Sequence, residues 1–216
     1  MKRIELLELL TANILGIKHE RPLLVAIDGY DAAGKSVLAK ELGEKLSGMG
    51  VNIIEASADG FHNPRVIRYK KGEESPEGYY YDSFNYAALK VMLLDSLKTG
   101  DLRYKTQPFD YVADKGIMST YSEAEMDSIL IFNGIFALRP ELRDYWDYSI
   151  YLYVDEEVSL KRGIARNLGD EEATRHRYNV RYIPGQRIYH REAEPMKHAS
   201  IVIDNNDPEN TVILEA

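Results

Sequence analysis

The chain has 216 residues, of which 44% are hydrophobic and 29% charged, and its formal net charge is −8. An acidic chain is a poor candidate for broad nucleic-acid binding, the absence of cysteine excludes disulfides and thiolate metal sites, and no apolar run approaches the ~20 residues that a membrane span needs. We expect a cytoplasmic protein that folds as one domain over residues 1–216 and acts on a small molecule. A homo-oligomer is left open.

Helical and strand patterns alternate along the chain, which predicts an α/β fold with a parallel sheet covered by helices on both faces. The polar tail from Asn205 is expected to form an edge element or to be only partly ordered. The expected elements are, in chain order, a helix over 2–15, a strand over 23–27, a helix to about 47, a strand that starts with residues 51–54 and ends at 57–59, a long functional loop over 60–84 that can include some helix, a helix over 85–98, an extended stretch over 103–112, strands over 128–132 and 148–154, helical segments over 156–192 with breaks near Gly169 and at Pro184–Gly185, and a strand over 199–204.

A complete phosphate-binding loop of the form G-x-x-x-x-G-K-[ST] occupies residues 29–36, between the first strand and the second helix. Its glycines allow backbone N–H groups to approach phosphate oxygens, Lys35 adds a positive charge at the β- and γ-phosphates, and Ser36 offers a hydroxyl to Mg²⁺. The loop predicts ATP or another nucleoside triphosphate, with Mg²⁺, as cofactors. The residues predicted to bind the nucleotide are Gly29, Asp31, Ala32, Ala33, Gly34, Lys35, Ser36 and Val37.

Two polar residues follow strands that should end near this loop, because ligands of open α/β sheets bind at the carboxyl ends of the strands. Asp59 follows the second strand and can accept a proton from a substrate hydroxyl or hold Mg²⁺. Asn133 ends a later strand, where phosphate-loop enzymes usually carry an acidic residue that orients Mg²⁺. We expect Ser36, Asp59 and Asn133 to form the metal site.

Arginines concentrate in the segment 162–182, which we expect to form a lid over the triphosphate. Arg162 and Arg166 lie four residues apart and so share one helix face. Arg162 is expected to bind the nucleotide and Arg166 to be catalytic, whereas Arg175 and Arg177 are expected to contact the substrate. The alternative is a surface helix with ordinary salt bridges.

The acceptor site is expected within residues 59–114, where aromatic and polar side chains gather. The predicted substrate-binding residues there are Phe61, His62, Tyr79, Asp82 and Phe109. For the tyrosines, packing over the edge of the sheet is an equally good interpretation.

Basic residues gather in two segments of this acidic chain, residues 65–71 and 161–191. Locally basic segments on an acidic body suit a small anionic ligand better than a long polyanion. The alternative interpretation is a solvated charged surface.

Taken together, these motifs resemble bacterial uridine kinase-like proteins, in the group of uridine kinase, phosphoribulokinase and pantothenate kinase. The similarity extends from about residue 22 to 206. The segments that carry it are the phosphate loop with Asp31, Asp59-Gly60-Phe61-His62, Arg68-Tyr69, Ser75-Pro76-Glu77-Gly78-Tyr79-Tyr80, Asp82-Ser83-Phe84, Gly134-Ile135-Phe136, Arg139-Pro140-Glu141-Leu142, Arg181-Tyr182 and Gly185-Gln186-Arg187-Ile188-Tyr189.

The resemblance implies a nucleoside-monophosphate-kinase-like fold with an arginine-bearing lid, and ATP-dependent phosphorylation of a primary hydroxyl. It assigns Asp59 as general base, Lys35 and Ser36 to ATP and Mg²⁺, and Arg166 to the lid. The chain departs from the group in two places. Asn133 replaces the usual Asp or Glu, and Phe109 and Asp114 stand near the positions of a base-contacting Tyr and His.

The leading hypothesis is therefore a kinase that phosphorylates the 5′-hydroxyl of uridine or cytidine. Within the same reaction class, pantothenate, nicotinamide riboside or a sugar-like alcohol remains as acceptor. A nucleotide-binding regulator with weak or no transfer is the alternative that Asn133 suggests.

Overall fold

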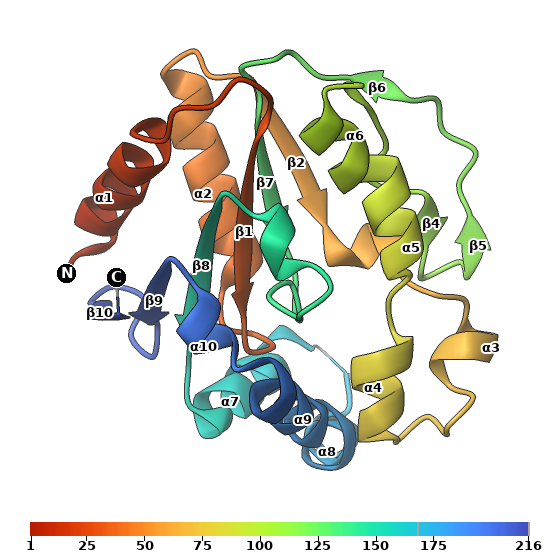
Figure 1. Ribbon diagram of the computed structural model, residues 1–216. Helices are drawn as coiled ribbons and strands as arrows, with labels where there is room; N and C mark the ends of the chain where they lie inside the picture. The colour runs from red at the N-terminus through yellow and green to blue at the C-terminus, as the bar shows by residue number, and fades with distance from the viewer. Residues whose placement is uncertain (168, 216) are drawn as a thin grey trace.

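The computed structural model describes residues 1–167 and 169–215, and its centre is a six-stranded sheet (Figure 1). Neighbouring strands pair in parallel, except that β10 lies antiparallel against β9 at one edge. The predicted α/β class is confirmed. In the order β10-β9-β8-β1-β7-β2 the strands span Val212–Glu215, Ile201–Asp204, Tyr148–Tyr153, Leu23–Gly29, Ile129–Asn133 and Ile53–Ser57.

Helices cover both faces of the sheet, with α1 and α2 on one side and α4 to α6 and α9 on the other (Figure 1). None of the described helices is long and apolar enough to cross a membrane. The helices are α1 (Arg3–Leu15), α2 (Lys35–Gly48), α3 (Arg65–Arg68), α4 (Pro76–Asp82), α5 (Tyr86–Leu89), α6 (Asp95–Thr99), α7 (Glu156–Arg166), α8 (Glu171–Arg177), α9 (Ile183–Ala193) and α10 (Pro195–His198). Shorter elements are the 3₁₀ turns η1 (Ala58–Phe61) and η3 (Arg143–Tyr145), the π turns η2 (Lys90–Leu94) and η4 (Tyr178–Tyr182), and the strand pairs β3 (Arg103–Tyr104) with β6 (Ser122–Glu123) and β4 (Phe109–Asp110) with β5 (Lys115–Gly116).

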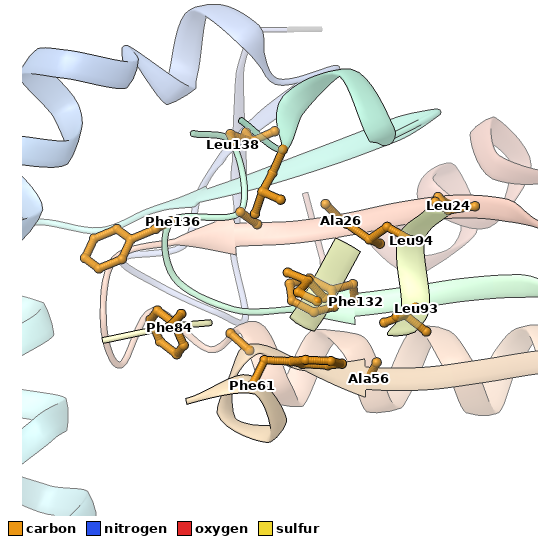
Figure 2. Packing of buried hydrophobic residues seen from close by; sticks show 14 of the residues in the cluster. Leu24, Ala26, Ala56, Phe61, Phe84, Leu93, Leu94, Phe132, Phe136 and Leu138 are labelled. Atoms are coloured by element: carbon orange, nitrogen blue, oxygen red, sulfur yellow. The ribbon is translucent and has the colours of Figure 1, made fainter. Parts of the chain in front are cut away.

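The core consists of two apolar layers, one on each face of the sheet. Side chains alternate along a strand, so Leu23, Val25 and Ile27 of β1 pack toward α1 and α2. Leu24 and Ala26 point to the other face, where they share a cluster with side chains of β7 and the π turn η2 (Figure 2). Burial on both faces explains why β1 is a continuous apolar run.

The register aligns the carboxyl ends of three strands. Ile27 of β1 lies beside Asn133 of β7, which in turn pairs with Ser57 of β2. Because the strands are parallel, the segments that follow them emerge at the same edge of the sheet. The phosphate loop, Asn133 and the turn with Asp59 therefore meet there.

The predicted helix break at Pro184–Gly185 is wrong. Helical backbone continues from α8 through the π turn η4 into α9, and Pro184 lies in the first turn of α9. Proline is tolerated in a first turn, where its missing N–H costs no helical bond, and a π turn just before it resets the bonding register. Gly185 serves packing, because a Cβ there would lie 2.7 Å from Tyr79 Cδ1 on α4.

The break near Gly169 is confirmed, since α7 ends at Arg166 and α8 begins at Glu171. The second strand ends at Ser57, within the predicted end, but it begins at Ile53 rather than at Val51, because its partner β7 begins at Ile129. The predicted helix over 85–98 forms as α5, η2 and α6.

Candidate active site

The phosphate loop lies between β1 and α2 in the strand–loop–helix arrangement that the sequence predicts. Gly29 has φ +145° and Gly34 has φ +97°, values that favour glycine. A Cβ on Gly29 would also lie 2.2 Å from the carbonyl oxygen of Leu152. Helix α2 begins at Lys35, so the free N–H groups of its first turn adjoin the loop.

Lys35 is buried at the centre of this loop. Its ammonium group donates hydrogen bonds to the carbonyl oxygens of Gly29 and Tyr30, at 3.0 and 2.5 Å. Burial lowers the pKa of Lys35, and the negative charges of Asp31, Asp28 and Asp59 oppose this effect. The ammonium group therefore rests among carboxylates at the position where the loop would receive a phosphate.

Ser36 and Asn133 are in contact at the carboxyl edge of the sheet. The Ser36 hydroxyl donates to Asn133 Oδ1 at 3.2 Å, and Asn133 Nδ2 donates to the carbonyl oxygen of Ala56 at 3.3 Å. The second bond fixes the amide so that its oxygen faces Ser36.

The chemistry of this donor set fits Mg²⁺, which prefers hard oxygen ligands and keeps several waters when nucleotide phosphates share its coordination. Ser36, Asn133 and Asp59 would hold the ion. No group of three or more His, Cys, Asp or Glu suited to a metal is present in residues 1–167 and 169–215. Most of the negative charge around the ion would therefore come from the nucleotide.

Asp59 lies in η1, directly after β2. Its side chain is 65% exposed and lies 3.5 Å from His62 Nε2. The hydrogen bond from His62 lowers the pKa of Asp59, and the charges of Lys35 and Arg166 lower it further. The Asp59 carboxylate is thus ionised and accessible to a ligand, and the positive charges of Lys35 and Arg166 stabilise its ionised form.

His62 is held in a fixed orientation beside Asp59. Its Nδ1 lies 3.0 Å from the carbonyl oxygen of Ser83, and its ring stacks on Phe84 with centroids 4.5 Å apart. The ring of Tyr111 covers it at 5.1 Å. His62 therefore orients Asp59 from a packed position.

Asp31 of the phosphate loop is held by three elements that follow β8. Its carboxylate lies 3.5 Å from Arg166 of α7 and accepts a hydrogen bond from the Tyr178 hydroxyl of η4. Its carbonyl oxygen accepts from Ser159 at 2.7 Å, and its N–H donates to Gln186 Oε1 at 2.8 Å. Asp31 thereby attaches the arginine-bearing segment directly to the loop.

Arg162 attaches the same segment to the end of β9. Its Nη2 donates to the carbonyl oxygens of Asn205 and Asn206, at 2.9 and 3.0 Å. Asn205 Nδ2 donates in turn to the carbonyl oxygen of Ala33 at 2.7 Å. Arg162 therefore reaches the phosphate loop through Asn205.

The predicted acceptor residues occupy three kinds of position. Phe61 and Tyr79 pack in the core cluster, with 1% and 8% of their surfaces exposed, and half-buried Phe109 lies on β4. Asp82 is buried and pairs with Lys70 and Lys71 at 3.2 and 2.8 Å. Arg175 and Arg177 lie exposed on α8, where Arg175 pairs with Glu171.

Sequence reasoning missed several residues that hold the site, above all Asp28. It is fully buried under the loop, and burial raises its pKa. Its carboxylate accepts hydrogen bonds from the N–H groups of Gly29 and Leu138, at 2.7 and 2.8 Å, and from the Tyr189 hydroxyl. For Asp28, an acidic residue at the end of an apolar strand was the available signal. Gln186 and Tyr189 lie in a segment that carries the family resemblance, whereas nothing local marked Tyr178 or Ser159.

The comparison with protein families identifies the chain. The model of the family described as "Phosphoribulokinase / Uridine kinase family" matches residues 24–177. The chain belongs to this family. Its members are phosphotransferases that use ATP and act on hydroxyl acceptors, so the chain is a kinase, as the motifs predicted.

Individual relatives carry two activities in their names. A uridine kinase of Clostridium botulinum (strain Langeland / NCTC 10281 / Type F) is 29% identical over 192 residues, which cover 85% of this chain and 88% of that protein. A pantothenate kinase of Rhizobium rhizogenes (strain K84 / ATCC BAA-868) is 29% identical over 152 residues, which cover 63% of this chain and 45% of that protein.

Among solved structures, a possible uridine kinase from Bacillus stearothermophilus superposes with a TM-score of 0.72 at 24% identity. The superposition covers 92% of this chain and 97% of that one. At this identity the match establishes the fold, and the predicted phosphate-loop kinase fold is confirmed.

Helix α7 approaches Tyr178 so closely that only glycine fits at position 163. A Cβ there would lie 2.1 Å from the Tyr178 hydroxyl and 2.2 Å from Cζ. We expect Gly163→Ala to lower the free energy of unfolding by about 1–3 kcal/mol, the usual cost of overpacking, and to displace Tyr178 from Asp31. Urea unfolding measures the change.

Gly48→Ala is the matched control, because a Cβ at the end of α2 meets nothing within 4 Å. Alanine is the better helix former, so this variant should be neutral or slightly more stable. Equal stability of the two variants would show that Tyr178 moves away from the added Cβ without loss of folding free energy.

Proposed function

We propose that this protein transfers the γ-phosphoryl group of ATP, as a Mg²⁺ complex, to a primary hydroxyl of a small molecule. The supporting observation is the ionised, exposed Asp59 carboxylate at the same sheet edge as Lys35 of the phosphate loop. In this proposal Lys35 and Ser36 hold the donor and Asp59 faces the acceptor. The residues belong to one domain, with the acceptor region near 59–114 and a lid near 162–182.

The chemistry needs little beyond positioning and charge stabilisation. Asp59 would accept the proton of the acceptor hydroxyl while the oxygen of that hydroxyl attacks the γ-phosphorus of ATP. The bond between that phosphorus and the bridging oxygen breaks, and ADP leaves with the electron pair. Bound Mg²⁺ would neutralise phosphate charge, and Arg166 would move from Asp31 toward the transferring group.

Uridine or cytidine is the first acceptor to test, a choice supported by the names of the relatives. The replacement of the base-contacting pair by Phe109 and Asp114 weighs against it, since Asp114 accepts from the N–H of Arg65 at 2.9 Å and pairs with Arg68 at 3.2 Å. Pantothenate, nicotinamide riboside and sugar-like alcohols are the alternatives. The proposed cytoplasmic location and the absence of a nucleic-acid partner rest on sequence composition, and a homo-oligomer remains open.

The test is ATP consumption by the purified protein with each acceptor in turn. The proposal predicts acceptor-dependent ADP formation and a phosphorylated product detectable by mass spectrometry. ATP binding without transfer to any acceptor would contradict it and favour a nucleotide-binding regulator.

Asn133 provides a second, independent test. Because a carboxylate adds a negative charge beside Ser36, we expect Asn133→Asp to reach half-maximal turnover at a roughly tenfold lower Mg²⁺ concentration, equivalent to about 1.4 kcal/mol. Asn13→Asp adds the same charge on α1, where Tyr148 can still hydrogen-bond the side chain, and should change nothing. A silent wild type with turnover restored by Asn133→Asp would support the regulator.

A further inference from the structure

Two buried arginines lie together on the acceptor side of the site, at the positions where α3 and η4 approach each other. Arg68 is 6% exposed and Arg181 is 4% exposed. Both guanidinium groups lie over the ring of Tyr69, with distances of 5.4 and 5.1 Å to its centroid. Burial lowers the pKa of Arg181, and the positive charge of Arg68 lowers it further.

Among the described residues, only one carboxylate pairs with these two guanidinium groups. Arg68 pairs with Asp114 at 3.2 Å and also donates to the Tyr111 carbonyl oxygen, but its buried Nε lacks a partner among the described residues. Among the described residues, Arg181 donates from Nη1 alone, to the carbonyl oxygens of Glu73 and Ser75 at 2.7 and 3.1 Å. Within residues 1–167 and 169–215, no carboxylate forms an ion pair with Arg181.

Burial of a guanidinium group without a counter-ion is costly, and removing one partner of a buried pair destabilises strongly. The aromatic faces of Tyr69 and Tyr79 offset part of this cost for Arg181. The neighbouring carboxylate of Asp82 is engaged by Lys70 and Lys71. Among the described residues, Arg181 is thus buried without a carboxylate partner, while the neighbouring carboxylates of Asp82 and Asp114 are engaged.

The arginine pair is connected to the residues around Asp59. Arg68 holds the backbone of Tyr111, whose ring covers His62, and His62 contacts the Asp59 carboxylate. On the other side, Arg181 lies 5.4 Å from the ring centroid of Tyr79. Burial raises the pKa of Tyr79, and the negative charge of Asp31 raises it further. Packed side chains thus connect Arg68 to the residues around the proposed base.

We propose that Arg68 and Arg181 bind an anionic group of the acceptor, a carboxylate or a phosphate, while its primary hydroxyl faces Asp59. This inference rests on the proposed kinase function and narrows its substrate class. Planar guanidinium groups match both anions bidentately. An ion pair of this kind would complete the charge balance that the protein leaves open.

The test compares acceptors with and without an anionic group: pantothenate with panthenol, glycerate and glycerol 3-phosphate with glycerol, and uridine 3′-phosphate with uridine. Each neutral member carries a hydroxyl where its partner carries the carboxylate or phosphate, so product analysis identifies which hydroxyl is phosphorylated. We expect kcat/KM to be at least about tenfold higher for the charged member of the preferred pair, because hydrogen bonds to charged groups contribute about 1.5–3 kcal/mol. The glycerate and glycerol 3-phosphate arms distinguish a carboxylate from a phosphate. Equal or better turnover of every neutral member would overturn the proposal.

A binding measurement distinguishes failure of the proposed kinase function from failure of the proposed anion site. With the phosphate loop saturated by MgADP, titration calorimetry of the same pairs reports on the acceptor side alone. Selective binding of charged members without transfer would support the anion site and reject the kinase. If no charged member binds more tightly than its neutral partner, the anion site is wrong.

Arg181→Gln removes the charge that lacks a protein counter-ion, and Arg191→Gln is its control on α9, where the exposed Arg191 pairs only with Glu192. Arg181→Gln should abolish the preference for the charged acceptor and leave the KM for ATP unchanged, whereas Arg191→Gln should preserve both. Arg181→Lys, which keeps the charge, should retain part of the preference and replaces the glutamine variant if that fails to fold. An unchanged charged-to-neutral ratio in the Arg181 variants would mean that Arg181 only fixes the loop at Glu73 and Ser75.

Discussion

Lys35→Ala should lower kcat by roughly 10³-fold, at the upper end of the effect of removing one donor to a transition-state charge. The ammonium group lies buried in the phosphate loop, where nothing else carries a positive charge at the same position. The fold should survive, because Lys35 bonds only to the carbonyl oxygens of Gly29 and Tyr30 and the apolar layers on both faces of the sheet are untouched. Steady-state kinetics measure the loss, and circular dichroism with thermal unfolding checks the fold.

Lys40→Ala is the control for the lysine variant. Lys40 lies one turn and a half further along α2, is 73% exposed and makes only a 3.8 Å pair with Glu44. Its removal should leave turnover unchanged, since an exposed pair of this kind contributes at most about 0.5 kcal/mol. Wild-type turnover in Lys35→Ala would show that the loop does not serve catalysis.

Asp59→Asn should reduce transfer by 10²- to 10⁴-fold while ATP still binds, the range in which a general base contributes. Asparagine keeps the size of the side chain and removes its ability to take the hydroxyl proton. Because Lys35, Ser36 and Asn133 are unaltered and the asparagine amide still offers an oxygen to Mg²⁺, the dissociation constant for MgATP should change much less than the rate of transfer. Single-turnover kinetics and nucleotide calorimetry separate the two effects.

Asp101→Asn makes the same change in the exposed segment after α6 and should leave both quantities unchanged. The pH profile gives an additional check. His62 lowers the pKa of Asp59, so the carboxylate is ionised at neutral pH and this group should reduce the rate only when the pH falls through that lowered value. If Asp59→Asn transfers phosphate normally, another group is the base.

For this protein, a feature could be predicted from the sequence when the residues that form it lie close together in the chain. Residues 29–36 are contiguous, so the phosphate loop, its buried strand and its helix could be recognised from local pattern alone. The same holds for the ends of β2 and β7, because a parallel sheet brings Asp59 and Asn133 to one edge whatever the details. The helix break predicted at Pro184 does not form, since the π turn before it has no local signature.

The partners that hold the site could not be predicted in the same way. Asp31 was recognised as part of the loop, but its contacts come from Ser159, Tyr178 and Gln186, more than a hundred residues away. Asp28 escaped notice because its burial depends on Leu138 and Tyr189. Such contacts depend on how whole helices pack, which no short segment encodes.

The sequence by itself thus determined the donor end of the reaction, because a phosphate loop is a local backbone conformation specified by adjacent residues. It also determined the sheet edge at which chemistry can occur, through the alternation of strands and helices. Only the tertiary structure decided which charged side chains near that edge have an ion-pair partner. It pairs Asp82 with lysines and Asp114 with Arg68, and it buries Arg181 without a carboxylate among the described residues. Charge balance in a pocket is a sum over elements distant in the chain, and it exists only once they have packed together.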